Sequence, residues 1–171
     1  YPLVGSVEAF RCAADPSKLR YQGKLLPRVI SYAANCFLGP PSGWVASSGQ
    51  GRYRSMSKLG DITDPGPSSI YILLDEHENS INDAHFDPFE NLTRYANNPW
   101  LDAVSGRHGN ACGISFADGH SEIHKWKTAG LNKNQKSSDG STPRPYAALT
   151  FIGPATVSDY QWMTNHIAPF K

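Results

Sequence analysis

The chain has 171 residues, a length that fits one domain with a substantial hydrophobic core. Its 16 basic and 15 acidic residues leave a formal net charge of +1, which excludes the basic stripe of a nucleic-acid-binding protein and the polybasic patch of a membrane-surface protein. Apolar residues make up only 39% of the chain, and 15 glycines and 13 prolines accompany them, so we expect one loop-rich domain over residues 1–171, of the α+β or mostly-β class, rather than a helical bundle.

The longest apolar runs, such as residues 70–74, are too short to cross a bilayer. The chain opens on YPLVGSVEAF, without the basic start and apolar block of a secretion signal. We therefore expect a mature or trimmed chain.

The first 40 residues predict short elements separated by turns. FRCAADPSK at 10–18 leads into a turn at Asp15-Pro16-Ser17, and the β-branched and aromatic residues of segment 25–38 favour a strand. GPPSG at 39–43 then breaks the chain.

The clearest strand of the first half is SIYILLD at 69–75. It follows a Pro-Gly-Pro turn and is a short apolar run bounded by breakers, which is typical of a central, buried strand. An acidic, Asn-rich segment follows from Asp75 to Asp87, and we expect it to be a solvated loop.

The segment RHGNACGISFADGHSEIHKW at 107–126 predicts a β-hairpin with a two-residue turn at Asp118-Gly119. Such a turn pairs Ile114 with Ile123. Alternation then places Cys112, Ile114, Phe116 and Ile123 on the core face. The opposite face would carry Gly113, Ser115, Ala117, His120, Glu122, His124 and Trp126.

The last 45 residues predict a long polar loop, a strand and a short helix. AGLNKNQKSSDGSTPRP at 129–145 is rich in Gly, Ser and Pro, and YAALTFI at 146–152 is the strand candidate. A C-terminal helix is expected to begin near Ser158, which could act as its N-cap.

Three histidines and an acidic turn within the hairpin raise the question of a metal or catalytic site. A site shared by His108 and Asp118 is disfavoured, because a strand over residues 111–117 would separate them by about 23 Å. His120, Glu122 and His124 alternate along one strand face and could hold a transition metal, although a solvated strand face is the commoner outcome.

The acidic segment after residue 74 offers hard oxygen ligands. Asp75, Glu76 and Asp83 could hold calcium, but the spacing is not that of an EF-hand. A solvated loop without a metal is the alternative.

Little in the sequence predicts an enzyme. A Gly-x-Ser-x-Gly elbow and a phosphate-binding loop are both missing, and spacing alone identifies no Cys–His pair. Cys12, Cys36 and Cys112 lie far apart without a Cys-x-x-Cys pair, which excludes a zinc ribbon. One disulfide with a free thiol and three free thiols both remain open.

Several segments together resemble a bacterial family. RHGNACGISFADGH contains His108, nine residues and then Asp118-Gly119, which resembles the His-x9-Asp-Gly signature of prepilin-type, type II secretion G-like pseudopilins. FRCAADPS resembles the family's Phe-x-Cys-Pro-x-Asp segment, with Ala13 in place of proline. SYAANCFLG resembles its Ser-Tyr-x-x-Asn segment, and IYILLDEHENSIND its strand ending in Asp-Glu. The four segments occur in the family's order and cover most of the chain; Cys36 departs from the pattern.

The resemblance implies a non-enzymatic structural subunit of a type II secretion or type IV pilus-like filament. The expected fold is a pilin-like head: a small antiparallel sheet with long loops, packed on the end of an N-terminal helix that precedes this chain. That helix would anchor the subunit in the bacterial inner membrane before assembly. Other pilin or pseudopilin subunits would be its partners. Relatives often carry a cysteine shortly after the helix, which would be a partner for Cys12, and often hold calcium in a loop.

Two other functions remain as alternatives. The first is a secreted module that binds carbohydrate or another ligand, since four Trp and eight Tyr offer stacking surfaces. The second, a small metallohydrolase, rests only on His120, Glu122 and His124.

Overall fold

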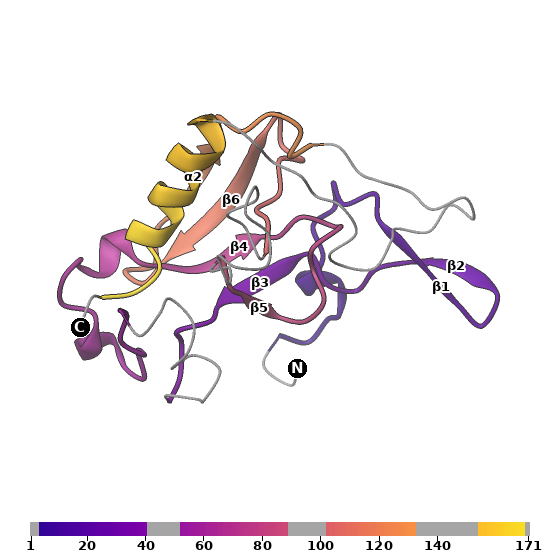
Figure 1. Cartoon of the computed structure of the whole chain (residues 1–171). Helices are drawn as coiled ribbons and strands as arrows, with labels where there is room; N and C mark the ends of the chain where they lie inside the picture. The colour runs from indigo at the N-terminus through magenta and orange to yellow at the C-terminus, as the bar shows by residue number, and fades with distance from the viewer. Residues whose placement is uncertain (1–3, 41–51, 89–101, 133–153, 170–171) are drawn as a thin grey trace.

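The computed structural model describes residues 4–40, 52–88, 102–132 and 154–169 (Figure 1). A five-stranded sheet forms the centre, with strand order β5-β3-β4-β6-β7, and one helix packs on it. This is an α+β fold, as the sequence predicts. The elements of the sheet and its helix are β3 (Tyr32–Asn35), β4 (Tyr71–Asp75), β5 (His85–Phe86), β6 (Ala111–Phe116), β7 (Ser121–Lys125) and α2 (Pro154–Asn165). Among the described residues, the short 3-10 helix η1 (Glu8–Phe10) precedes the first strand, and η3 (Leu59–Asp61) and η4 (Pro67–Ser69) lie between β3 and β4.

Strand β4 is the middle strand of the sheet, which confirms the prediction for SIYILLD. It pairs antiparallel with β3 and β6, while β5 pairs parallel to β3 at the edge. Tyr71 and Leu74 are fully buried, whereas Leu73 is 45% exposed. One face of the sheet is therefore covered and the other is partly open.

Helix α2 covers the closed face. Met163 of α2 and Ile167, two residues beyond its end, are fully buried in the cluster that contains Ile114 and Phe116 of β6. The helix begins at Pro154, a residue suited to the first turn of a helix, so the prediction of a start near Ser158 was wrong. The predicted strand at 146–152 lies outside the described residues.

The hairpin β6–β7 forms, but its register differs from the predicted one. The turn has three residues, because Phe116 N–H donates to the carbonyl of His120, and Gly119 has a φ of 93°. Gly113, not Ile114, therefore lies opposite Ile123. Since a slip of one residue reverses a strand's faces, Ile123 is 68% exposed, and its predicted place in the core was wrong.

The core face of β6 itself is as predicted, since Cys112, Ile114 and Phe116 are all buried. Glu122 and His124 of β7 share this covered face of the sheet, because they lie opposite Ile114 and Cys112. Trp126, predicted on the opposite face, is buried in the core with 3% exposure.

A second, two-stranded sheet stands apart from the first. Strands β1 (Lys18–Tyr21) and β2 (Lys24–Pro27) pair through a turn at Gln22 and Gly23, whose φ values of 48° and 75° suit a type I′ turn. All eight strand residues are exposed, and Figure 1 shows the hairpin projecting from the body of the molecule. We call residues 18–27 the hairpin arm.

The helices that the structure describes are all too short or too polar to cross a membrane.

Candidate functional site

The first part of the acidic segment, residues 75–81, is buried, so the prediction of a solvated loop was wrong there, whereas residues 82–85 are exposed as predicted. Residues 75–81 are at most 4% exposed. Three backbone hydrogen bonds tie these residues to two other segments: Glu76 N–H donates to the carbonyl of Ser31, His77 N–H to that of Ala103, and Ser105 N–H to that of Asp75. The segment therefore lies at the centre of the fold rather than at its surface.

Arg107 compensates the negative charge of this segment. Its guanidinium donates to Asp75 Oδ1 at 3.0 Å, to the carbonyl of Glu76 at 2.7 Å and to Glu78 Oε2 at 3.3 Å. The side chains of Arg107, Asp75 and Glu78 are each 3–4% exposed. Burial alone would lower the pKa of Arg107, but the charges of Asp15, Asp75 and Glu78 outweigh it and raise the pKa above its usual value. The guanidinium is thus a permanent buried cation.

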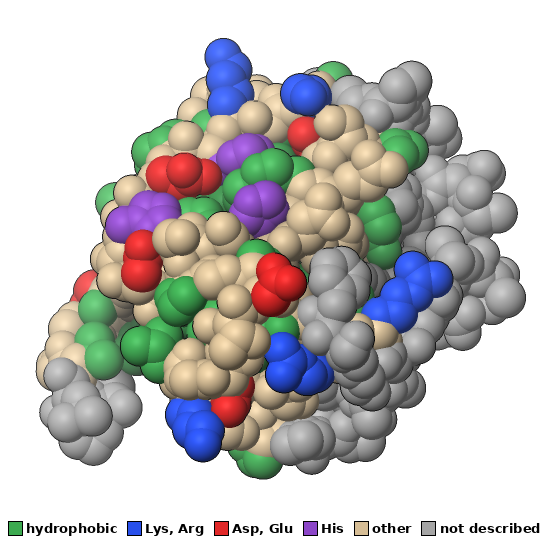
Figure 2. All heavy atoms as spheres, turned by 90° about the vertical axis from the view of Figure 1, so that its left-hand side faces the viewer, with side chains coloured by type: hydrophobic (Ala, Val, Ile, Leu, Met, Phe, Trp, Pro, Cys, Tyr) green, Lys and Arg blue, Asp and Glu red, His purple; other side chains and the backbone are tan. Residues whose placement is uncertain are grey.

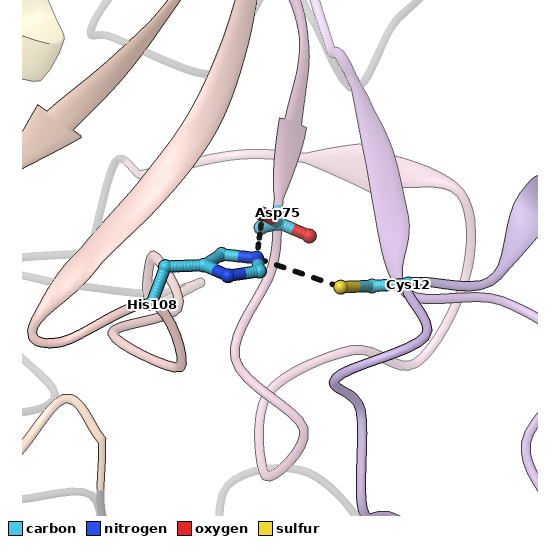
Figure 3. A group of neighbouring side chains, drawn as sticks. All are labelled: Cys12, Asp75 and His108. Carbon is cyan, nitrogen blue, oxygen red and sulfur yellow. Dashed lines mark hydrogen bonds and ion pairs between the residues drawn. The ribbon is translucent and has the colours of Figure 1, made fainter.

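Next to this ion pair, three side chains from distant segments converge (Figure 3). Cys12 follows η1, Asp75 ends β4, and His108 lies in the turn before β6. Cys12 Sγ lies 3.5 Å from His108 Nε2, and Asp75 Oδ2 lies 3.3 Å from the same nitrogen. Asp75 Oδ2 also accepts a hydrogen bond of 3.0 Å from Gly113 N–H. We call Cys12, Asp75 and His108 the Cys-Asp-His cluster.

The geometry of the Cys-Asp-His cluster differs from that of a catalytic triad. In a triad the nucleophile and the carboxylate approach opposite nitrogens of the imidazole ring, so that the ring can pass on a proton. Here both the thiol and the carboxylate approach Nε2. Convergence of three different ligand atoms on one point is instead what a metal ion requires.

A second group of polar residues fastens the N-terminal segment to β3. Asp15 Oδ2 accepts from Ser31 Oγ at 2.5 Å, and Asp15 Oδ1 accepts from Ser17 N–H at 2.8 Å. Burial would raise the pKa of Asp15, but these two hydrogen bonds and the charge of Arg107 lower it below its usual value. Asp15 is therefore a buried carboxylate that remains ionised.

The three predicted calcium ligands are not brought to one point. Asp75 pairs with Arg107 and His108, as described above. Glu76 is fully buried, its Oε1 accepts from Ser80 Oγ at 2.9 Å, and burial together with the charge of Asp102 raises its pKa well above the usual value. Asp83 is exposed and caps its own loop by accepting from His85 N–H at 2.7 Å.

The predicted transition-metal ligands share one face of β7, but each has other contacts. His120 stacks on Phe116, and its Nδ1 lies 2.6 Å from Asp118 Oδ1. His124 Nδ1 lies 3.6 Å from Glu122 Oε1. Among the residues described, the Cys-Asp-His cluster is the only group of three potential ligands whose donor atoms lie within 4.8 Å of one another.

Aromatic rings surround His124. Its ring centroid lies 4.3 Å from that of Trp126 and 3.9 Å from that of Trp162, and Trp162 in turn stacks on His166 at 4.0 Å. Figure 2 shows histidine side chains gathered around apolar atoms on one face of the molecule. Burial lowers the pKa of His124, so this ring is neutral at pH 7.

All three cysteines are free thiols, which answers the question that their spacing left open. Burial raises the pKa of Cys36 and Cys112 far above the usual range, so both thiols are inert. Cys12, by contrast, lies 3.5 Å from His108 Nε2 and belongs to a group of potential ligands with His108 and Asp75.

The sequence did not reveal the Cys-Asp-His cluster, because Cys12 and His108 lie 96 residues apart. One signal pointed towards it: each of its members belongs to a segment that carries the family resemblance. No protein-family model, curated protein or solved structure matches this chain.

Proposed function

We propose that this chain is the head domain of a pilin-like subunit, of the type II secretion or type IV pilus-like kind, and that it acts by assembly rather than catalysis. In this proposal an apolar helix precedes Tyr1 and anchors the subunit in the inner membrane before assembly. The head then lies on the outside of the filament and makes contacts between subunits.

The observation that supports this proposal most strongly is the contact among the segments that carry the resemblance. His108 of the His-x9-Asp-Gly segment contacts Cys12 of FRCAADPS and Asp75 of the β4 segment. Asp15 of FRCAADPS accepts a hydrogen bond from Ser31 of SYAANCFLG. Four segments far apart in the sequence thus hold one another in place, which gives a physical reason for their occurring together in one protein.

The same contacts favour a structural role for the signature histidine. His108 lies at one end of β6, and Asp118 lies beyond the other end, where it accepts hydrogen bonds from His120 within the turn. Each end of the signature therefore fixes one end of the same strand. A structural signature of this kind fits a subunit whose task is to present a rigid head.

The hairpin arm is the surface that we assign to contact between subunits. Leu19, Tyr21 and Leu26 share one face of the arm and are 41–63% exposed. A two-stranded hairpin by itself is marginally stable in water, and an exposed apolar face adds to the cost. We propose that a second copy of the chain covers this face in the filament.

The gene sequence upstream of Tyr1 provides the simplest test. The proposal expects a short basic leader, a Gly-Phe-Thr-x-x-Glu-like start and an apolar helix of about 20 residues. An ordinary cleavable secretion signal in that place would contradict it.

Site-specific photo-crosslinking in cells tests the contact between subunits. A photoreactive residue in place of Tyr21 should yield crosslinked copies of the chain in assembled filaments. The same residue in place of Leu59, which is 60% exposed in η3 and distant from the arm in sequence, is the matched control. Crosslinks of equal yield at both positions, or at neither, would refute the role of the arm.

One feature favours the alternative of a ligand-binding module. An apolar hollow of about 310 Å³ opens to solvent beside Ile72 of β4 and Ala117 of the hairpin turn, and its lining also includes Leu38, Met56, Leu59 and Ile62. Its volume lies at the lower end of ligand pockets, and it is widely open, so it would bury little of a ligand. Binding of a polysaccharide or a small apolar ligand to the purified chain would favour this alternative.

A further inference from the structure

The ligand atoms of the Cys-Asp-His cluster lie close together (Figure 3). His108 Nε2 lies 3.5 Å from Cys12 Sγ and 3.3 Å from Asp75 Oδ2. Hydrogen bonding explains these contacts incompletely. A neutral imidazole nitrogen either donates or accepts, so Nε2 cannot both donate to Asp75 and accept from the thiol of Cys12. A single hydrogen on Nε2 would have to be shared between sulfur and oxygen.

A zinc ion satisfies all three groups at the observed spacing. Zinc binds sulfur at about 2.3 Å, imidazole nitrogen at about 2.05 Å and carboxylate oxygen at about 2.1 Å, in a tetrahedron. These bond lengths place sulfur about 3.6 Å from nitrogen and nitrogen about 3.4 Å from oxygen. The observed separations are 3.5 Å and 3.3 Å, and the third pair, Sγ and Oδ2, lies within 4.8 Å. The two measured separations therefore match a tetrahedral zinc site, in which Sγ and Oδ2 would lie about 3.6 Å apart.

The surroundings orient the ligands as a metal site requires. Arg107 donates to Asp75 Oδ1, and Gly113 N–H donates to Asp75 Oδ2, the oxygen that would bind the metal. Tyr32 lies beside Cys12, and burial together with the electrostatic interaction with Cys12 raises the pKa of Tyr32. Such outer contacts fix the direction of ligating groups and are typical of protein metal sites. A thiolate and a carboxylate would also neutralise the two charges of the ion.

The ligand set selects the class of metal. A thiolate and an imidazole favour zinc over calcium and magnesium, which prefer oxygen ligands. Cys12 and Asp75 are buried, whereas the side chain of His108 is 35% exposed, so solvent reaches the cluster from the side of His108. We propose that Cys12, Asp75 and His108 bind one zinc ion, with water as the fourth ligand. The ion fastens the N-terminal segment to the ends of β4 and β6, a role that does not depend on the filament proposal.

Metal titration of the reduced, metal-free chain tests this inference. Calorimetry with Zn²⁺ should give one site per chain, and bound zinc should raise the midpoint of thermal unfolding. Co²⁺, added as a spectroscopic probe, should give thiolate-to-metal absorption in the near ultraviolet and the intense visible bands of a tetrahedral ion. The cobalt spectrum reports thiolate ligation in the unmodified chain, so this test holds even where a variant fails to fold.

Variants locate the ion. Cys12→Ser and His108→Ala should each weaken zinc binding by at least about 100-fold. Cys36→Ser, which changes another buried cysteine, and His124→Ala, which changes the alternative metal face on β7, should retain it. The inference is overturned if the reduced chain binds no zinc, if its cobalt complex lacks the thiolate band, or if Cys12→Ser binds zinc as tightly as the unmodified chain.

Discussion

Replacement of Arg107 is the sharpest test of the buried polar centre. Arg107→Met removes the cation and three hydrogen bonds while it leaves Asp75 and Glu78, whose side chains are 3–4% exposed, without their partner. Removal of one member of a buried ion pair costs about 3–5 kcal/mol. The free energy of unfolding of such a domain is about 5–15 kcal/mol, so the variant should lose a large part of it.

Urea denaturation at pH 7, with a chelator present to remove metal, measures this loss. Arg107→Lys keeps the charge but loses the forked geometry, so it should lose less stability than Arg107→Met. Lys125→Met removes a cation from the exposed face of β7 and should change the free energy of unfolding by at most about 0.5 kcal/mol. A loss below about 1 kcal/mol for Arg107→Met would refute the reasoning. The reasoning would also be refuted if Asp75→Asn, added to Arg107→Met, restored none of the lost free energy of unfolding. The restored part measures the cost of the uncompensated charge on Asp75.

Three further substitutions test separate parts of the structure by the same denaturation assay. Gly106→Ala should cost about 1–3 kcal/mol, because the added Cβ would lie 2.6 Å from the carbonyl carbon of Leu131. Asp159→Ala should also cost about 1–3 kcal/mol, because Asp159 Oδ2 accepts from the backbone N–H and the hydroxyl of Thr128, both at 2.7 Å. Asp102→Asn should stabilise the chain increasingly as the pH rises from about 4 to about 8. Burial raises the pKa of Asp102 from 3.8 to about 8. Between these two pH values the unfolded state has released a proton that the folded state still holds, so the free energy of unfolding of the unmodified chain falls as the pH rises.

Each of these substitutions has a control or a contrary outcome. Gly60→Ala places its Cβ in open space and should change the free energy of unfolding by at most about 0.5 kcal/mol; equal losses at Gly60 and Gly106 would contradict the close contact. An unchanged unfolding midpoint in Asp159→Ala would mean that this carboxylate does not join α2 to the segment after β7. Parallel pH profiles of Asp102→Asn and the unmodified chain would contradict the raised pKa of Asp102.

Local sequence patterns were sufficient for much of the fold. The apolar run SIYILLD, bounded by breakers, identified β4 as the central strand, and alternation along β6 identified its buried face. These predictions succeeded because strand formation and the burial of alternate residues depend on neighbours in the sequence. The α+β class followed from the same short elements.

The register of the hairpin was not decided locally. Asp118-Gly119 can occupy either a two-residue turn or the last two positions of a three-residue turn, and the two choices differ by one residue in pairing. The choice depends on which face of β7 meets the core. Trp126 and His124 pack against Trp162 of α2, which lies about 40 residues further along the chain, and this contact favours the three-residue turn.

The sequence by itself determined the elements whose causes are local: the central strand, the buried face of β6 and the position, though not the length, of the turn at Asp118-Gly119. Only the tertiary structure decided the burial of the acidic segment, because charged residues are buried when a distant cation such as Arg107 compensates them. The tertiary structure also brings together the three residues of the Cys-Asp-His cluster. Strands β4 and β6 are paired in the sheet, and the N-terminal segment packs against their ends, so Cys12 meets His108 across 96 residues. The spacing of Cys12 and His108 along the chain does not predict that contact.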